Sequence, residues 1–185
     1  MAVTLPEKVG PWTVDDLADL PEGPWRYEIV DGSLLMSPAP APRHEVVLAS
    51  LLILLRETVP SPERVLGPAG VTFGASYRVP DLVVVREGID LWDAKTISPA
   101  DVELVIEIVS PGSVTEDRIT KPAQYAAQGI GAFWRIEIDN ELSLSAYVLQ
   151  PGNDFYTAIG TWVEGERVDL REPFVFSFAI GQLRT

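Results

Sequence analysis

Cysteine is absent from the 185-residue sequence, and basic residues are scarce relative to acidic ones. Without cysteine the chain forms neither disulfides nor thiolate metal sites, and its composition suits a reducing compartment such as the cytoplasm. The 14 lysines and arginines face 27 aspartates and glutamates, which gives a net charge of −13 and argues against broad electrostatic binding of nucleic acid. A local basic groove, or divalent ions that screen phosphate at one site, remain compatible with this charge.

Long apolar runs and targeting signals are also missing. The N-terminus has no apolar core and no small-residue cleavage site, so we expect no secretory signal. The most apolar run, Val46 to Leu55, is too short to span a bilayer and lies between Arg43 and Arg56. A hydrophobic content of 46% with 22% charged residues is ordinary for a globular protein. We therefore predict one cytoplasmic domain over residues 1–185 that does not enter a membrane.

Cap and turn residues predict a short helix and a hairpin near the N-terminus. A threonine followed by acidic residues indicates a helix over Thr13–Leu20. The pair Asp31-Gly32 favours a two-residue turn between strands over Trp25–Val30 and Ser33–Met36. Glu28 falls inside the first of these strands. We expect its side chain to face solvent, and an inward position near a site is the alternative.

The strongest helix signal covers Arg43–Thr58, after a stiff proline-rich connector. A broad apolar stripe along this helix consists of Val47, Leu48, Leu51, Leu52 and Leu55. His44, the only histidine, lies at the inward edge of the helix start. A capping or packing role suits it better than catalysis, and contact with a phosphate at the positive helix end is a further option.

Two apolar segments each carry one carboxylate. Tyr77–Val85 is read as a strand in which Asp81, after a proline, opens the apolar part at the rim of the sheet. Asp101–Val109 predicts a strand that is apolar on both faces, which is typical of the middle of a covered sheet. Glu107 inside it is costly as an ionised carboxylate unless it is paired, hydrogen-bonded or bound to a metal. The plainer interpretations are a turn aspartate at Asp81 and a strand end where Glu107 reaches solvent or an arginine.

A second helix is predicted over Pro122–Gln128, because proline opens it and Gly129 follows it. Lys121 then stands at the helix start, where a cation gains nothing from the helix dipole, so it faces an anion or is simply solvated. The polar segment Glu87–Ser98 predicts a loop with at most one helical turn. Predicted strands complete the β-rich C-terminal part, at residues 133–138, 142–149, 155–163, 168–170 and 174–178.

Asp81, Glu107 and Lys121 together indicate a hydrolytic site. Adjacent strands lie about 4.8 Å apart, so facing carboxylates on them can share a cation. Two carboxylates with water and phosphate oxygens suit Mg²⁺ or Mn²⁺, which are hard ions. Such an ion activates water and stabilises charge on a phosphodiester, while a nearby lysine holds the water or the scissile phosphate. Hydrolysis of this kind needs no cysteine or serine nucleophile.

The ordered set of motifs resembles the PD-(D/E)XK nuclease superfamily, and more specifically the Uma-two family of predicted bacterial restriction-type endonucleases. The matching stretches are Tyr27-Glu-Ile-Val-Asp-Gly-Ser33, Ser37-Pro-Ala-Pro with His44, Val79-Pro-Asp81, Glu107-Ile-Val-Ser-Pro111 and Asp117-x3-Lys121-Pro-x2-Tyr125-x3-Gly129-Ile130. The similarity continues from Phe133 into the closing β segment and covers nearly the whole chain. The Pro-Asp and Glu pieces are individually weak, but the ordered set with Asp-x3-Lys-x3-Tyr is fairly specific.

The resemblance implies an α/β (mixed α+β) fold: a restriction-endonuclease-like mixed β-sheet flanked by helices, with an added N-terminal hairpin and a β-rich C-terminal part. It implies that Asp81, Glu107 and the backbone carbonyl of Ile108 bind the metal. Lys121 takes the place of the superfamily lysine, whose usual position is here Val109. The resemblance also implies supporting positions near the site, at Glu28, His44, Asp117 and Tyr125.

We therefore predict a Mg²⁺- or Mn²⁺-dependent phosphodiesterase that acts on nucleic acid, with a DNA endonuclease favoured. The alternative is a catalytically silent domain of the same fold that binds nucleic acid or a protein partner, which the charge of −13 favours. A glycosidase with carboxyl groups roughly 5 to 9.5 Å apart is a more distant alternative, because the motifs show no evident sugar-stacking surface. Restriction-type enzymes often act as dimers, so analogy allows a homodimer.

Overall fold

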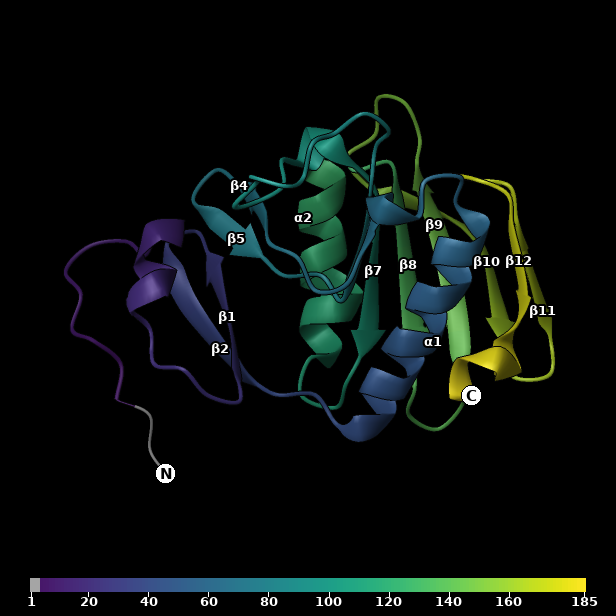
Figure 1. Ribbon diagram of the computed structural model, residues 1–185, viewed down its shortest axis with the longest axis horizontal. Coiled ribbons are helices and arrows are strands. Elements are labelled where there is room, and N and C mark those ends of the chain that lie inside the picture. The colour runs from purple at the N-terminus through teal and green to yellow at the C-terminus, as the bar shows by residue number, and fades with distance from the viewer. Residues whose placement is uncertain (1–3) are drawn as a thin grey trace.

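The computed structural model of the protein describes residues 4–185, so the first three residues of the predicted domain lie outside the described part. Two parts lie side by side: a small sheet with the N-terminal segment, and a larger sheet with both α-helices (Figure 1). This mixed arrangement of helices and sheets confirms the predicted fold class. None of the helices in residues 4–185 is long and apolar enough to cross a membrane.

The small sheet is antiparallel, in the order β2-β1-β5-β4. Its strands are β1 (Trp25–Val30), β2 (Ser33–Pro38), β4 (Val71–Phe73) and β5 (Ser76–Arg78). The predicted hairpin is confirmed: Asp31 and Gly32 have φ of 47° and 78°, the positive values that a tight hairpin turn needs. The predicted first helix is a 3-10 helix over Val14–Asp19, where Asp16 accepts hydrogen bonds from the N–H and hydroxyl of Thr13.

The large sheet has the order β10-β9-β8-β7-β6-β3, and only its β7–β8 pair is parallel. Its strands are β3 (Val65–Leu66), β6 (Leu82–Val85), β7 (Val102–Val109), β8 (Ala132–Glu137), β9 (Ser143–Leu149) and β10 (Tyr156–Val163). Short 3-10 helices precede β3 and β7, at Pro62–Arg64 and Pro99–Asp101. As predicted, β7 lies inside the sheet and is apolar on both faces.

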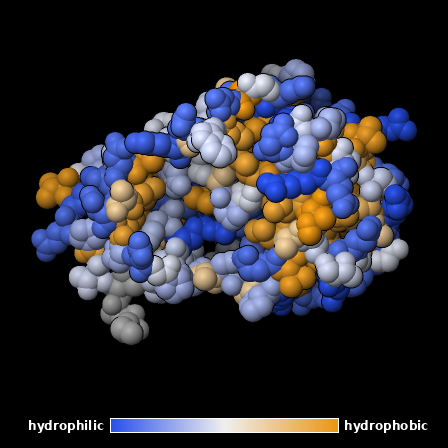
Figure 2. Space-filling model, viewed as in Figure 1, coloured by the Kyte–Doolittle hydropathy of each residue, from blue (hydrophilic) through white to orange (hydrophobic). Residues whose placement is uncertain are grey.

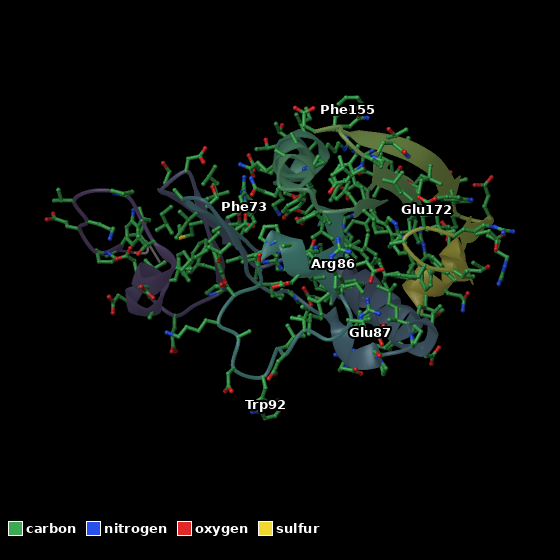
Figure 3. All side chains as sticks on the ribbon, turned by 90° about the horizontal axis from the view of Figure 1, so that it is seen from above. Phe73, Arg86, Glu87, Trp92, Phe155 and Glu172 are labelled. Atoms are coloured by element: carbon green, nitrogen blue, oxygen red, sulfur yellow. The ribbon has the colours of Figure 1, made fainter. Side chains whose placement is uncertain are left out.

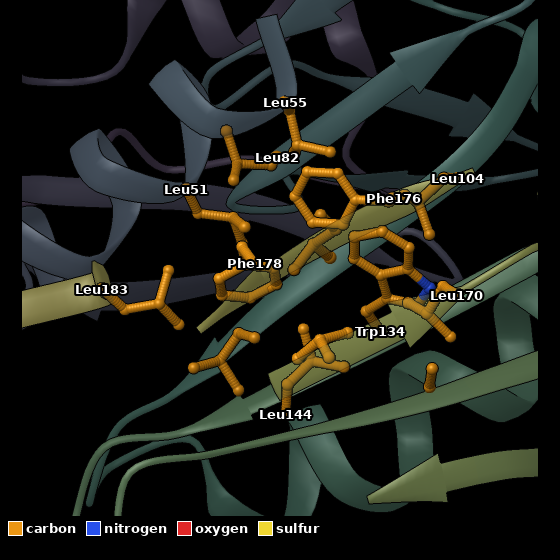
Figure 4. Close-up of a cluster of buried hydrophobic side chains, with 14 of the residues drawn as sticks. Leu51, Leu55, Leu82, Leu104, Trp134, Leu144, Leu170, Phe176, Phe178 and Leu183 are labelled. Carbon is orange, nitrogen blue, oxygen red and sulfur yellow. The ribbon is translucent and has the colours of Figure 1, made fainter. Parts of the chain in front are cut away.

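Alternate residues of these strands supply two hydrophobic cores. On one face Leu82 and Leu104 pack with α1 (Pro42–Thr58), as predicted for this helix. The same core is closed by β11 (Arg167–Leu170), β12 (Phe176–Ala179) and the 3-10 helix Ile180–Arg184 (Figure 4). On the other face Val83 and Val105 pack with Tyr125 of α2 (Lys121–Ala127). Burying side chains of this size contributes about 1.5–3 kcal/mol each.

The predicted strand Tyr77–Val85 is wrong as one element. It is divided between β5 of the small sheet and β6 of the large sheet, with Val79–Asp81 as the connection. Pro80 has no N–H for a ladder, and the N–H of Val79 donates to a side chain, Oε1 of Glu28, at 2.7 Å. The chain therefore leaves one sheet and enters the other within three residues.

The predicted start of the second helix is also wrong. Helical backbone already begins at Val114, continues through a π-helical turn over Glu116–Thr120 and runs directly into α2. The N–H of Lys121 donates to the carbonyl of Glu116, five residues back. Pro122 is thus inside the helix, where the missing N–H and the ring disturb a regular α-turn, and a wider π-turn accommodates such a disturbance.

The segment that follows β6 is a loop without helix, so the optional helical turn in Glu87–Ser98 does not form. Its Trp92 is 93% exposed and points away from the body of the protein (Figure 3).

Candidate active site

A cavity of about 390 Å³ lies where the small sheet, the connection into α1, the end of β7 and the π-turn meet. Hydrophilic side chains gather in a hollow between the N-terminal part and the rest of the molecule (Figure 2). The predicted site residues that line the cavity are Glu28, His44, Asp81, Glu107, Ile108, Asp117 and Lys121. Tyr125 lies behind them, hydrogen-bonded to Glu107. The structure therefore brings all the predicted site residues together.

Asp81 stands at the entry to β6 and is 2% exposed. Its Oδ2 accepts the N–H of Ile108 at 2.8 Å and lies 3.2 Å from Nε2 of His44, and its Oδ1 accepts from Nη1 of Arg26 at 2.7 Å. Burial by itself raises the pKa of this carboxyl, but the contact with His44, the charge of Arg26 and the Ile108 amide together lower the pKa to about 2. Asp81 is therefore a stable anion.

Glu107 lies in the neighbouring strand, where Leu82, next to Asp81, pairs with Ile106. Its side chain is fully buried, and its oxygens accept from Nζ of Lys121 at 3.0 Å and the hydroxyl of Tyr125 at 2.7 Å. Burial raises the pKa of Glu107 well above its usual value, although the charge of Lys121 opposes this. Other buried carboxylates, Asp117 first among them, raise it further. The site thus holds more negative charge than its cations neutralise.

Lys121 is 5% exposed and contacts three carboxylates. Its Nζ lies 3.0 Å from Glu107, 3.2 Å from Asp117 and 3.7 Å from Glu28. Burial alone would lower the pKa of Lys121, but the charges of these carboxylates raise it. The π-turn and the first turn of α2 present Asp117 and Lys121, four residues apart, on the same side of the helix.

The expectation that Glu28 faces solvent is wrong, since it is 4% exposed and lies in the cavity wall. It accepts from the N–H of Val79 and lies 3.3 Å from Nη1 of Arg78, which is itself fully buried. Arg78 also donates to Gln124 and Glu116, both at 2.9 Å. The face of β1 that carries Glu28 is covered because the small sheet docks on the π-turn, α2 and the large sheet.

Sequence reasoning missed Arg26 and Arg78, the two arginines that contact the carboxylates. Both are in the small sheet, in β1 and β5, and each pairs with an acid about 50 residues away. One sequence signal was available: Arg78 directly precedes the Val79-Pro-Asp81 stretch, next to an apolar strand where an unpaired charge is costly.

The donor chemistry of the site suits one hard divalent cation. Within residues 4–185 no group of three or more histidine, aspartate or glutamate side chains is arranged as ligands of a metal ion. Mg²⁺ nevertheless needs only one or two carboxylates, with water and phosphate oxygens completing its shell. Asp81 and Glu107 supply two carboxylates on one cavity, whose lining holds five carboxylates against the cations Arg26 and Lys121, an excess of negative charge that a bound cation would relieve.

The fold is of the restriction-endonuclease-like class. The sequence profile of the Uma2 family, described as "Putative restriction endonuclease", matches residues 14–181, so the chain belongs to that family and the resemblance is confirmed. No curated protein matches the chain. Among solved structures, a "putative nuclease belonging to DUF820" from Anabaena variabilis is similar with a TM-score of 0.69 and 21% identity, over 94% of this chain and 98% of that chain. This likeness confirms the fold.

Proposed function

We propose that the protein is a metal-dependent phosphodiesterase that cleaves nucleic acid, most simply a DNA endonuclease. The observation that carries the proposal is the meeting of Asp81, Glu107 and Lys121 in one cavity, from two adjacent strands and a helix. Lys121 reaches Glu107 at 3.0 Å from the helix after the strand, which supports its replacing the lysine absent at Val109. Membership in a family described as restriction endonucleases supports nucleic acid as the substrate class.

In this proposal Asp81, Glu107 and the carbonyl of Ile108 hold Mg²⁺ or Mn²⁺. The bound ion supplies Lewis-acid chemistry for a water molecule and for the charge on phosphate. Lys121 orients the attacking water or binds the scissile phosphate, and the lysine stays protonated because three carboxylates surround it. Tyr125 fixes Glu107 from behind through a hydrogen bond, so that carboxylate is positioned before any substrate arrives.

Calorimetric titration of Mn²⁺ tests the site without any assumption about substrate. We expect binding by the wild type that is lost in Asp81→Asn, while Asp154→Asn, the same change at an exposed position, leaves it intact. Cleavage of plasmid DNA, single-stranded DNA and RNA is then measured with Mg²⁺ and Mn²⁺. Wild-type protein that binds no Mn²⁺, even with a non-cleavable oligonucleotide present, would count against the proposal.

The second candidate is a catalytically silent domain that binds nucleic acid or a protein partner, favoured by the net charge of −13. Alanine substitution of Asp81, Glu107 and Lys121 separates the two. An enzyme loses cleavage while oligonucleotide binding survives, whereas the silent domain shows no cleavage that the substitutions could remove.

A further inference from the structure

One of the two oxygens of Asp81 is held by a side chain that can leave. Oδ2 is bonded to a backbone N–H, that of Ile108, and contacts the buried ring of His44. Oδ1 is bonded to Arg26, whose side chain is 23% exposed and lines the cavity. A cation that binds Asp81 from the cavity therefore competes with Arg26 for Oδ1.

The two arginines of the site differ in how firmly they are held. Arg78 is fully buried and donates to three side chains, those of Glu28, Glu116 and Gln124. Arg26 is partly exposed, and its hydrogen bond in the structure goes to Asp81. Moving the guanidinium of Arg26 into the cavity breaks one charged hydrogen bond, whereas moving that of Arg78 breaks three. Arg26 is the cation of this site that can move.

A guanidinium released from Asp81 remains charged at the cavity wall. A planar guanidinium matches two oxygens of a phosphate as well as it matches a carboxylate. The cavity is lined by five carboxylates, so a phosphodiester entering it needs cations on its surface. Arg26 supplies one such cation only after it has left Asp81.

We propose that Arg26 exchanges partners: it holds Asp81 in the metal-free protein and binds the phosphodiester of the substrate once a divalent ion occupies Oδ1. The inference rests on the proposed function. It adds Arg26 as a residue that binds substrate, and it states that the metal ion displaces Arg26 from Asp81 before Arg26 binds the phosphodiester. It makes metal and substrate binding cooperative, because each favours the same position of Arg26, and such coupling is reciprocal. In the metal-free protein Arg26 adds to the contacts of His44 and the Ile108 N–H that compensate the charge of Asp81.

The first test is titration of Mn²⁺, at fixed ionic strength, into the wild type, Arg26→Met and Arg118→Met. Arg118 is an exposed arginine paired with Glu137, so its variant controls for the loss of one positive charge. We expect Arg26→Met to bind Mn²⁺ about tenfold more tightly than the wild type, because its competitor is gone. The control should change by less than about twofold. Mn²⁺ binding by Arg26→Met that is equal to or weaker than that of the control would overturn the exchange.

The second test measures binding of a fluorescent phosphorothioate oligonucleotide with and without Mn²⁺. Mn²⁺ should strengthen oligonucleotide binding in the wild type and in Arg118→Met. The factor of strengthening in these two proteins should be about fivefold larger than the factor in Arg26→Met. Equal factors in all three proteins would overturn the exchange. The two proposals fail separately. If the wild type binds Mn²⁺ and Arg26→Met binds it equally well, only the exchange is refuted. If no protein binds Mn²⁺, even with the oligonucleotide present, the metal site itself is refuted.

Discussion

Replacing Asp81 with asparagine is expected to destabilise the metal-free protein by about 2 kcal/mol at neutral pH. Burial opposes ionisation of this carboxyl, yet His44, Arg26 and the Ile108 amide lower its pKa from 3.8 to about 2. A difference of nearly two pKa units corresponds to about 2 kcal/mol of favourable interaction with the charged form. Asparagine keeps the shape of the side chain but loses the charge on which these contacts depend.

The sign of the pH dependence follows from the depressed folded-state pKa. The stabilisation is fully present above the unfolded pKa of 3.8 and is lost as the pH falls through about 2. The deficit of Asp81→Asn relative to the wild type should therefore be constant from neutral pH down to about pH 5 and shrink below about pH 4.

Urea unfolding in EDTA, followed by tryptophan fluorescence, measures this difference. For a domain of this length, about 2 kcal/mol corresponds to a Tm lower by roughly 4–8 °C. Asp154→Asn, at an exposed position, serves as the control and should match the wild type. The reasoning is refuted by an Asp81→Asn protein as stable as the wild type at neutral pH, or by a deficit that does not shrink in acid.

Three further substitutions are expected to change the stability of the protein, one of them upward and two downward. Burial raises the pKa of Glu107 despite Lys121, so the stability that this group contributes is present below pH 4.5 and lost as the pH rises through the folded pKa. Glu107→Gln should therefore raise Tm at pH 7.5, and a lower Tm there would contradict this sign. Arg78→Met removes a fully buried guanidinium from Glu28, Glu116 and Gln124 and leaves Glu28 only the more distant Lys121, so we expect a loss of about 3–5 kcal/mol in urea unfolding. A loss below about 1 kcal/mol would show that the contacts of Arg78 contribute little to stability. Tyr125→Phe removes the hydroxyl bonded to Glu107 and should cost about 1–3 kcal/mol, measured in the same way, whereas an unchanged midpoint would mean that the hydrogen bond contributes nothing.

The pairing of Asp81 with Glu107 could be predicted because strand periodicity is a local property. An aspartate that opens one apolar strand and a glutamate inside the next come together when the strands pair, as β6 and β7 do. The proximity of Lys121 was predicted from a resemblance and from its position before a helix. The position of Lys121 inside a longer helix with a π-turn was not predicted, because proline is common at the first position of a helix and Pro122 therefore indicates a helix start.

The burial of Arg26 and Arg78 and the ion pairs of Glu28 could not be predicted from the sequence, although the family resemblance placed Glu28 near the site. Each is a charged residue in a short strand, and such residues usually face solvent. Their burial depends on the docking of the small sheet, which is held by long-range contacts such as Arg26 with Asp81 and Arg78 with Glu116. Local patterns carry no information on such pairs. From the strand pattern, the alternative in which Glu28 points inward near a site was the prediction closest to the observed structure.

The connection Val79–Asp81 joins the small sheet to the large sheet beside the site. The N–H of Val79 is bonded to Glu28 of the small sheet, and two residues later Asp81 is bonded to the N–H of Ile108 in the large sheet. Each of these two bonds stays within one sheet, whereas the hydrogen bond from Arg26 of β1 to Asp81 crosses between the sheets and is lost when they separate. The cavity is lined by residues of both sheets, so it depends on their docking as well as on the folding of each. Hydrogen exchange of backbone amides beside this junction would therefore measure how firmly the two sheets are docked, separately from the stability of the large sheet's hydrophobic core.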